Sequence, residues 1–293
     1  MLNKLSLGTV QFGLNYGIAN NSGQINKAEV FKILDYCKDN NINCLDTAYE
    51  YGNSENIIGQ FLKQNENFFK VVSKTPKCKG KENCFIEKGL EGSLKRLGCK
   101  SIYGYLIHDI SELKVHGQQW INRLQELKKQ GKVEKIGISL YLPTELDFIL
   151  DNNMNIDLIQ LPYSVFDRRF ENYFDVLKSK NIEIHVRSVF LQGLPFAQEN
   201  RFVGILEKAK SRVLALKEIS KKKKIPLLAL CFCFVLLNER VDKVIFGVDS
   251  VKQLKNNIKM LKHVKDVANI EDILNAIIID DEQVLLPMNW GEK

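Results

Sequence analysis

The residues whose types and spacing could carry out chemistry begin with Asp46 and Tyr51. The segment 45–55 reads L-D-T-A-Y-E-Y-G-N-S-E, so an acid closes a short apolar run and a tyrosine follows shortly afterwards. Lys74 and His108 occupy similar places farther along, each directly after another apolar run. Each residue alone has a simple structural explanation, such as a turn acid or a packed ring. Packing does not require all four in one place, so together they indicate a catalytic site.

The chemistry that these four side chains support is proton transfer to a carbonyl oxygen. A tyrosine hydroxyl has an ordinary pKa of about 10 and is a poor acid at neutral pH. A nearby ammonium lowers that pKa, and a buried ammonium needs a carboxylate as its counter-charge. We therefore expect Asp46 to hold Lys74, Lys74 to lower the pKa of Tyr51, and Tyr51 to protonate an oxygen that His108 orients. No side chain here can supply a hydride, so carbonyl reduction or the reverse alcohol oxidation needs a cofactor.

The elements that must position these residues are short apolar runs alternating with helical patterns. Strands are predicted at 5–10, 42–45, 70–73, 102–107, 135–139, 158–161, 182–189 and 243–247. Helices are predicted at 27–40, 54–63, 85–97, 118–130, 143–150, 169–178, 201–222, 227–237, 250–261 and 270–278.

Continuous apolar strands are buried on both faces, as in a parallel sheet. Eight such units in 293 residues predict an α/β fold, a (β/α)8 TIM barrel forming a single domain over 1–293. An open doubly wound sheet is the alternative, but no G-x-G-x-x-G follows the first strand. In a barrel the carboxyl ends of the strands meet at one face, which would bring Asp46, Lys74 and His108 together.

The composition is that of a soluble globular protein, with 45% hydrophobic and 26% charged residues. A net charge of +7 favours anionic ligands such as phosphorylated cofactors, and no nucleic-acid-binding motif is present. Seven cysteines without C-x-x-C spacing predict reduced thiols and no metal site. No signal-peptide pattern is found, and the longest apolar run, 225–237, is too short to span a membrane. We therefore expect a cytoplasmic protein.

The motifs resemble those of the aldo-keto reductase family. They are the L-D-T-A-x-x-Y-G-x-S-E block at 45–55, the pairs Ser73-Lys74 and Ile159-Gln160, and the segments 107–109 and 135–139, in the order of the family. The resemblance implies a (β/α)8 barrel and NAD(P)H-dependent reduction of a small-molecule aldehyde or ketone. It places the family's catalytic tetrad on Asp46, Tyr51, Lys74 and His108, in the roles argued above.

The resemblance also implies which residues hold the cofactor. Asp46 belongs to that set, and the others are Gly8, Thr9, Val10, Ser139, Gln160, Arg187, Ser188, Phe190, Gly247, Val248, Asp249, Ser250, Gln253 and Asn257. Among them Ser139 and Gln160 would hold the nicotinamide carboxamide. The segment 247–250 joins a strand to a helix, and backbone N–H groups at a helix N-terminus form a phosphate site.

Three positions depart from the family pattern. Leu140 stands where an asparagine often contacts the carboxamide. Arg187 replaces a tyrosine that stacks on the nicotinamide; a flat guanidinium could stack there or bind an anionic substrate. Asp249 would repel a 2′-phosphate and accept from a free ribose hydroxyl. NADPH remains the expected cofactor, with NADH possible.

Two other functions fit a barrel with these residues. Lys74 could form a Schiff base in an aldolase, although pairing with Asp46 would keep it charged. A regulatory or sensor barrel could bind the cofactor with little turnover. Arg168 and Arg169 could favour an anionic substrate or simply face solvent at a helix start. We expect a monomer or small homo-oligomer without nucleic-acid or membrane partners.

Overall fold

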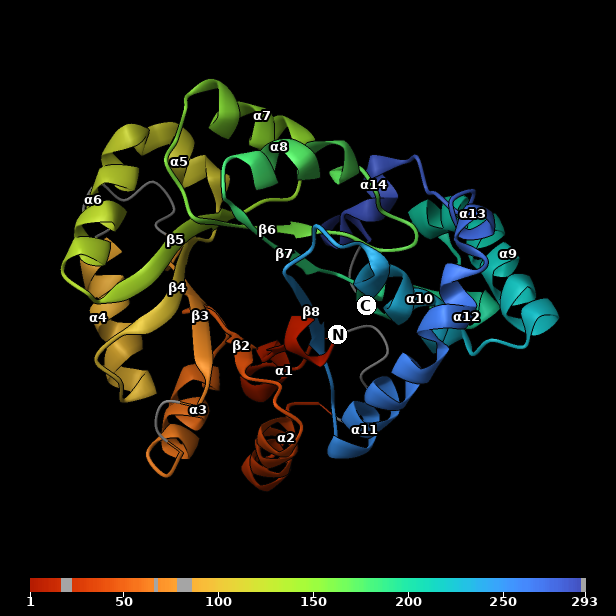
Figure 1. The fold of residues 1–293 in the computed structure, drawn as a ribbon, viewed down its shortest axis with the longest axis horizontal. Coiled ribbons are helices and arrows are strands. Elements are labelled where there is room, and N and C mark those ends of the chain that lie inside the picture. The colour runs from red at the N-terminus through yellow and green to blue at the C-terminus, as the bar shows by residue number, and fades with distance from the viewer. Residues whose placement is uncertain (17–22, 66–67, 78–85, 291–293) are drawn as a thin grey trace.

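The computed structural model describes residues 1–16, 23–65, 68–77 and 86–290, and its centre is a closed barrel of parallel strands. The strands follow one another around the barrel in chain order, and the last pairs with the first (Figure 1). They are β1 Leu5–Gly8, β2 Cys44–Asp46, β3 Lys70–Lys74, β4 Ile102–Ile107, β5 Val133–Ser139, β6 Leu158–Pro162, β7 Glu183–Arg187 and β8 Lys243–Gly247. The predicted (β/α)8 barrel is confirmed.

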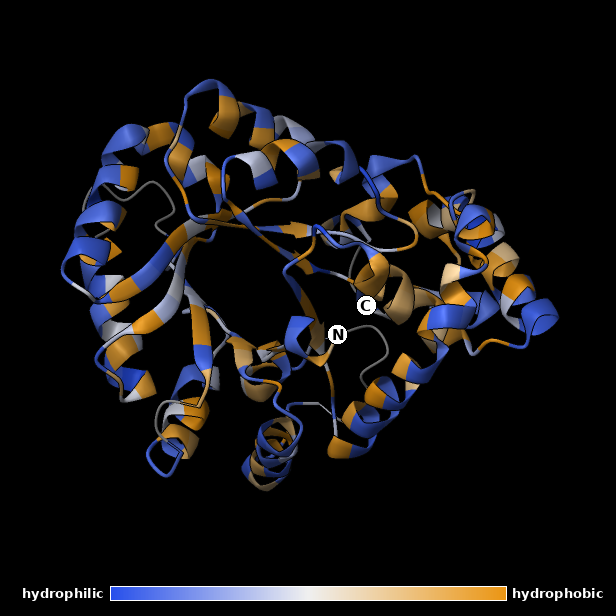
Figure 2. Ribbon diagram, in the orientation of Figure 1, coloured by the Kyte–Doolittle hydropathy of each residue, from blue (hydrophilic) through white to orange (hydrophobic). Residues whose placement is uncertain are grey.

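Helices surround the barrel and cover the outer faces of the strands (Figure 1). The main ones are α2 Lys27–Asp39, α3 Ser54–Leu62, α4 Ile86–Leu97, α6 Gln118–Lys129, α7 Pro143–Asp151, α8 Phe174–Ser179, α9 Glu207–Lys223, α10 Leu227–Leu237 and α11 Val251–Lys259. Apolar residues gather on the strands and on the inner faces of these helices (Figure 2). Helix α10 is apolar around its whole circumference because neighbouring helices cover it, and Ala229 through Leu236 are all buried.

The first strand is shorter than predicted. It ends at Gly8, and Val10–Gly13 forms a helical turn, α1, in place of the end of a strand. The reason is a pair of hydrogen bonds to the neighbouring strand. The backbone N–H and the Oγ1 of Thr9 both donate to the carbonyl oxygen of Asp46, each at 2.9 Å. The chain therefore turns across the mouth of the barrel directly after Gly8.

Other segments also differ from their predicted limits. Helix α9 begins at Glu207, because Gly204 adopts a φ of +56° that interrupts a continuous helix. In the 270–278 segment, only Glu271–Leu274 is helical, as α13. The 169–178 segment divides into a 3₁₀ turn, Glu171–Tyr173, and α8. Strand β7 stops at Arg187 because Ser188 has a φ of +61°. Helix α5, Ile110–His116, was not predicted; Asp109 caps it by accepting from the N–H of Ser111.

Within the described ranges, no helix has the length and apolarity needed to cross a membrane. The cysteines in these ranges are free thiols, and burial raises the pKa of Cys37, Cys231 and Cys233 to about 12. Cys78, Cys84 and Phe85, where a helix was expected to begin, lie outside the described residues. No group of side chains in the part that the structure describes could hold a metal ion.

Candidate active site

The structure brings Asp46, Tyr51, Lys74 and His108 together in one cavity of about 430 Å³. Asp46 ends β2, Lys74 ends β3, and His108 directly follows β4. Tyr51 lies in the loop between β2 and α3. These positions are all at the carboxyl ends of the strands, which is where barrel enzymes gather their reactive groups.

Asp46 and Lys74 form a closely packed buried ion pair. The Nζ of Lys74 donates to both carboxylate oxygens of Asp46 at 2.8 Å and to the carbonyl oxygen of Thr47 at 2.9 Å. Only 1% of Lys74 and 4% of Asp46 is exposed. Burial lowers the pKa of Lys74, whereas Asp46 opposes that shift. All three N–H groups of the ammonium are therefore occupied, and two of them bind the carboxylate that favours the charged form.

The loop that carries Tyr51 is held by very close backbone packing. Gly52 has a φ of +54°, and the loop lies so near Gly13 that a Cβ on Gly13 would be 1.8 Å from the carbonyl oxygen of Tyr51. Below the loop, the hydroxyl of Ser54 donates to the backbone oxygen of Thr9 at 3.0 Å and contacts the Oγ1 of Thr47 at 3.1 Å. These contacts fix the backbone of the loop that carries Tyr51.

Ser54 and Asn53, at the start of α3, do not cap the helix through their side chains. Asn53 is the N-cap residue but makes no side-chain cap bond, and Ser54 points to Thr9. Glu55 lies in the first turn of α3 and is buried, where it accepts from Ser73 at 2.6 Å and from the Nε of Arg96 at 2.7 Å. The carboxylate of Glu55 therefore connects α3 to β3 and α4 through hydrogen bonds.

Replacing Gly13 with alanine should displace Tyr51 and destabilise the fold. The added methyl group would overlap backbone atoms that have no flexible side chain to move, so we expect the free energy of unfolding to fall by about 1–3 kcal/mol. Urea unfolding monitored by circular dichroism measures this change. Gly92→Ala is the matched control, because its only close neighbour would be the flexible end of Arg96, with Tyr49 at ordinary contact distance, and alanine favours the helix. Equal stability of the two variants would contradict this account of the loop.

The pKa of Tyr51 is raised, not lowered as the sequence predicted. Burial is the largest cause, the carboxylate of Asp46 adds to it, and Arg187 opposes it. The Nζ of Lys74 lies 5.1 Å from the centroid of the Tyr51 ring, but its charge is neutralised by Asp46. Tyr51 is therefore fully protonated at neutral pH and has its proton available, as a general acid requires.

His108 is neutral in this site. Burial and the positive charge of Lys74 lower the pKa of His108 to about 3. Its backbone N–H donates to the Oγ1 of Thr75 at 3.1 Å, and its ring lies 6.1 Å from that of Tyr51 between centroids. The buried Nδ1 has no partner among the described residues. A neutral imidazole in this position can donate one hydrogen bond to a substrate oxygen without carrying charge into the site.

The low pKa of His108 predicts that acid destabilises the protein. Between about pH 6.5 and 3 the unfolded chain binds a proton at this residue and the folded chain does not, so stability falls as pH falls. At about pH 5 the loss attributable to His108 should reach up to about 2 kcal/mol. Denaturation of His108→Gln across this range should show a flatter pH dependence than that of the wild type. His263→Gln, at a histidine that does not line the cavity, should keep the wild-type slope. An unchanged slope in His108→Gln would refute the assignment.

The floor of the cavity contains a buried polar atom that has no partner among the described residues. Gly8, Thr9, Val10, Ser139 and Gln160 all line it. The Nε2 of Gln160 donates to the Oδ1 of Asp46 at 2.7 Å, which leaves its buried Oε1 with no partner within the described ranges. A buried unsatisfied amide oxygen is costly unless a ligand donates to it. An external amide N–H₂ would meet that need, so this part of the cavity fits a nicotinamide carboxamide.

The far end of the cavity lies between β8 and α11. Gly247, Asp249, Gln253 and Asn257 line it, as the resemblance implied, whereas Val248 and Ser250 do not. Ser250 instead caps α11 by accepting from the N–H of Gln253 at 3.2 Å. The Oε1 of Gln253 accepts from the N–H of Asp249 at 2.7 Å, and the buried Oδ1 of Asp249 has no described partner. Burial raises the pKa of Asp249.

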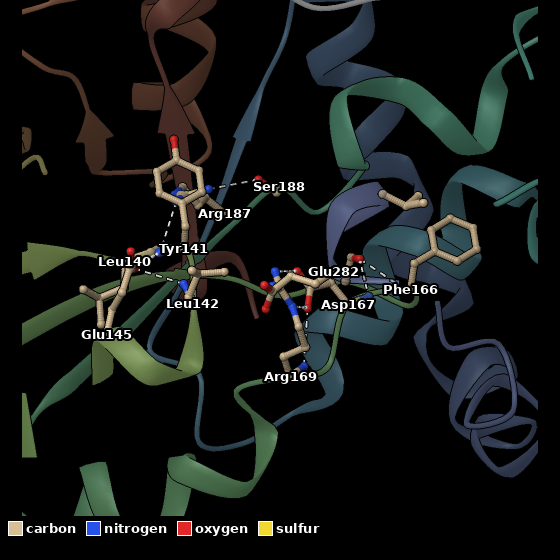
Figure 3. Close-up of polar contacts among 12 residues, drawn as sticks. Leu140, Tyr141, Leu142, Glu145, Phe166, Asp167, Arg169, Arg187, Ser188 and Glu282 are labelled. Carbon is tan, nitrogen blue, oxygen red and sulfur yellow. Dashed lines mark hydrogen bonds and ion pairs between the residues drawn. The ribbon is translucent and has the colours of Figure 1, made fainter. Parts of the chain in front are cut away.

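Arg187 lies flat against Tyr141 at the wall of the cavity (Figure 3). The guanidinium carbon is 4.0 Å from the centroid of the Tyr141 ring, and Nη2 donates to the carbonyl oxygen of Leu140 at 2.8 Å. Leu140, where an asparagine would be usual, is fully buried and contributes only its backbone. Arg168 and Arg169 do not line the cavity, and Arg169 pairs with Asp167 and Glu282 (Figure 3).

Several lining residues were not predicted. They are Gln11, Tyr16, Tyr141, Val189, Gln192, Gly193, Phe196, Leu228, Ile245, Phe246 and Asn256. Most come from loops, whose path over the mouth has no periodic sequence signal. Tyr141 and Gln11 could have been found, because each follows the end of a predicted strand within three residues.

Comparison with known proteins finds aldo-keto reductases and other oxidoreductases. The sequence profile described as "Aldo/keto reductase family" matches residues 4–278. The uncharacterized oxidoreductase YqkF of Bacillus subtilis is 25% identical over 88% of this chain and 90% of its own. The NADH-specific methylglyoxal reductase of Escherichia coli is 29% identical over 52% of this chain and 54% of its own. The aldo-keto reductase AKR11C1 of Bacillus halodurans, in its holo form, superposes with a TM-score of 0.76 at 24% identity, covering 94% of this chain and 91% of that one, and shares the fold.

Proposed function

This chain belongs to the aldo/keto reductase family, and from that premise we propose that it reduces an aldehyde or ketone to an alcohol using Tyr51 as the proton donor. The observation that carries the proposal is the convergence of Tyr51, His108 and the Asp46–Lys74 pair in one cavity beside an unsatisfied Gln160 amide. A bound reduced nicotinamide would supply the hydride.

The side chains divide the remaining work among them. Tyr51 donates its proton to the carbonyl oxygen as negative charge develops there, and the neutral His108 donates a hydrogen bond to the same oxygen. The Asp46–Lys74 pair holds the phenol ring from below, with Nζ 5.1 Å from the ring centroid. Gln160, fixed by its bond to Asp46, and Ser139 would hold the carboxamide of the cofactor.

The geometry does not favour the aldolase alternative. Schiff-base formation requires a neutral amine with a free lone pair, whereas the three N–H groups of Lys74 are committed to Asp46 and Thr47. A non-catalytic sensor would not need Tyr51 to remain unbonded toward a cavity, and this hydroxyl has no hydrogen bond to any described residue. Both alternatives predict no cofactor oxidation upon addition of a carbonyl compound.

For the cofactor we favour NADH over the NADPH that the resemblance suggests. The only cationic side chains lining the cavity are Lys74 and Arg187, both at the reaction end, so no lining lysine or arginine within the described ranges is available for a 2′-phosphate. Asp249 lies at the opposite end with an unpartnered carboxylate oxygen, which suits a free ribose hydroxyl and repels a phosphate. The relative from Escherichia coli is named as NADH-specific.

Replacing Asp249 with serine should therefore strengthen NADPH binding. Removing a charge from a half-buried position beside a phosphate should lower the Kd for NADPH by about tenfold and leave that for NADH within about threefold. Cofactor fluorescence titration measures both values. Asp272→Ser, on the exposed side of α13, is the control. Tighter NADPH than NADH binding in the wild type would overturn the preference.

The function itself is tested by titrating the protein with each cofactor and then adding a panel of aldehydes and ketones. The proposal predicts oxidation of the reduced cofactor that depends on the carbonyl compound. Tight cofactor binding without turnover on any member would refute the reductase proposal, and adduct formation at Lys74 trapped by borohydride would indicate an aldolase.

A further inference from the structure

Arg187 is a half-buried cation without an acidic partner among the described residues. It ends β7 and lines the cavity next to Tyr51, and no carboxylate in the part of the chain that the structure describes forms an ion pair with it. The other cation of the cavity, Lys74, is neutralised by Asp46. The reaction end of the cavity therefore has a net positive charge, and a protein interior does not leave such a charge uncompensated without cost.

The guanidinium is fixed in place by its surroundings. The Tyr141 ring covers one face at 4.0 Å, and the carbonyl oxygen of Leu140 accepts from Nη2 at 2.8 Å. Tyr141 is in turn anchored, because Glu145 accepts from the N–H groups of Tyr141 at 2.6 Å and Leu142 at 3.0 Å (Figure 3). Such a side chain loses little conformational entropy when it binds a ligand.

Arg187 retains unused hydrogen-bonding capacity. A guanidinium has five N–H groups, and in this structure one donates to Leu140 and one makes a longer contact, 3.3 Å, to the hydroxyl of Ser188. Ser188 has a φ of +61°, a strained backbone that turns the chain away directly after the arginine. The remaining N–H groups have no partner among the described residues, so they can bind an oxyanion.

The positive charge also reaches the catalytic groups. Arg187 lowers the pKa of Tyr51, His108 and Lys74, so it lies close enough to influence each of them. An anion bound to Arg187 would consequently be held beside the carbonyl group that Tyr51 protonates. Among the described lining residues, no other one offers an uncompensated charge at this end.

We infer that Arg187 selects substrates in which the reacting carbonyl compound also carries a carboxylate or phosphate group. This inference rests on the proposed function and names the substrate class of that site. Arg187 binds the oxyanion through its free N–H groups, while the carbonyl oxygen lies toward Tyr51 and His108. Carboxylate and phosphate share the geometry that a guanidinium recognises.

Matched pairs of carbonyl compounds test the inference. Succinic semialdehyde is compared with butanal, and glyceraldehyde 3-phosphate with glyceraldehyde, using kcat/KM for each member. We expect the wild type to favour at least one anionic member by about 10- to 100-fold, the range expected for a charge-assisted hydrogen bond. The pair that shows the larger ratio identifies the oxyanion. A wild-type ratio near unity for both pairs would overturn the inference.

Variants separate substrate recognition from other roles of Arg187. In Arg187→Gln the ratio should fall to about unity, and in Arg187→Lys it should be intermediate because the planar fork is lost. Both members of a pair use the same cofactor, so any effect on cofactor binding cancels in the ratio. Arg212→Gln, an exposed residue of α9, should keep the wild-type ratio. Equal loss for charged and neutral substrates in Arg187→Gln would show that Arg187 acts on Tyr51 and not on the substrate.

A binding measurement tests the anion site at Arg187 independently of carbonyl reduction. Succinate, which cannot be reduced, should bind the wild type and Arg212→Gln in calorimetric titration and bind Arg187→Gln about 10-fold more weakly. If Arg187→Gln does not fold, competitive inhibition of the wild type by succinate but not by butanol gives the same answer. Arg187-dependent succinate binding without reduction of any carbonyl would refute the proposed function alone. Reduction without preference or succinate binding would refute the anion site alone.

Discussion

Replacing Tyr51 with phenylalanine should lower kcat for carbonyl reduction by about 10²- to 10⁴-fold, the usual contribution of a general acid. The ring would keep its place above Lys74, because the loop is fixed through Gly13 and Ser54 and not through the hydroxyl. The hydroxyl makes no hydrogen bond to any described residue, so its removal should leave the free energy of unfolding within about 1 kcal/mol of the wild type. Stopped-flow or steady-state oxidation of the reduced cofactor measures the rate.

The appropriate control lies in the same sequence block. Tyr49 is stacked on Arg96, is partly exposed and does not line the cavity, so Tyr49→Phe should retain the wild-type rate. The Kd for the cofactor should change by no more than about twofold in either variant. If Tyr51→Phe retained full turnover with normal folding, Tyr51 would not be the proton donor and the mechanism would need another acid.

Replacing Lys74 with methionine should both inactivate the enzyme and destabilise it by about 3–5 kcal/mol, because the carboxylate of Asp46 would remain buried without its counter-charge. Lys74 and Asp46 are almost fully inaccessible, which is why this pair differs from the many exposed pairs of the molecule. Urea denaturation at neutral pH measures the loss. The double variant Asp46→Leu/Lys74→Met should recover much of the stability but none of the activity.

Lys128 supplies the comparison for that effect. It pairs with Asp157 at 2.6 Å, but more than a third of its side chain is exposed, so Lys128→Met should cost less than about 1 kcal/mol. If Lys74→Met were no more destabilising than Lys128→Met, then Lys74 would be uncharged in the folded protein. That result would reopen the possibility of amine chemistry at this residue.

The parts of the fold that could be predicted are those set by local apolar periodicity. Each barrel strand was recognisable as a continuous apolar run, and strands β4 and β8 have the predicted limits. Because a closed parallel barrel gathers its carboxyl ends, the approach of Asp46, Lys74 and His108 followed from the strand count alone. The Asp46–Lys74 pair was likewise predictable, since a buried ammonium requires a carboxylate.

The remaining features depend on contacts between distant segments. The helical turn after Gly8 is stabilised by Asp46, and the sequence of the first strand does not contain that information. The pKa of Tyr51 is raised, whereas the sequence predicted that it is lowered. Burial and the charge of Asp46 raise it, and the ammonium of Lys74 has little effect because Asp46 neutralises its charge. The sequence shows that Arg187 departs from the family pattern. Its stacking on Tyr141 could not be predicted, because it depends on the path of the loop after β5.

The most direct test of the central claim uses a reduced cofactor that carries deuterium at the transferable position of the nicotinamide. After turnover of a carbonyl substrate, mass spectrometry of the alcohol should show a single deuterium on the former carbonyl carbon, and Tyr51→Phe should form this product far more slowly. Product without deuterium, or a covalent adduct on Lys74 in place of the alcohol, would contradict hydride transfer in this cavity.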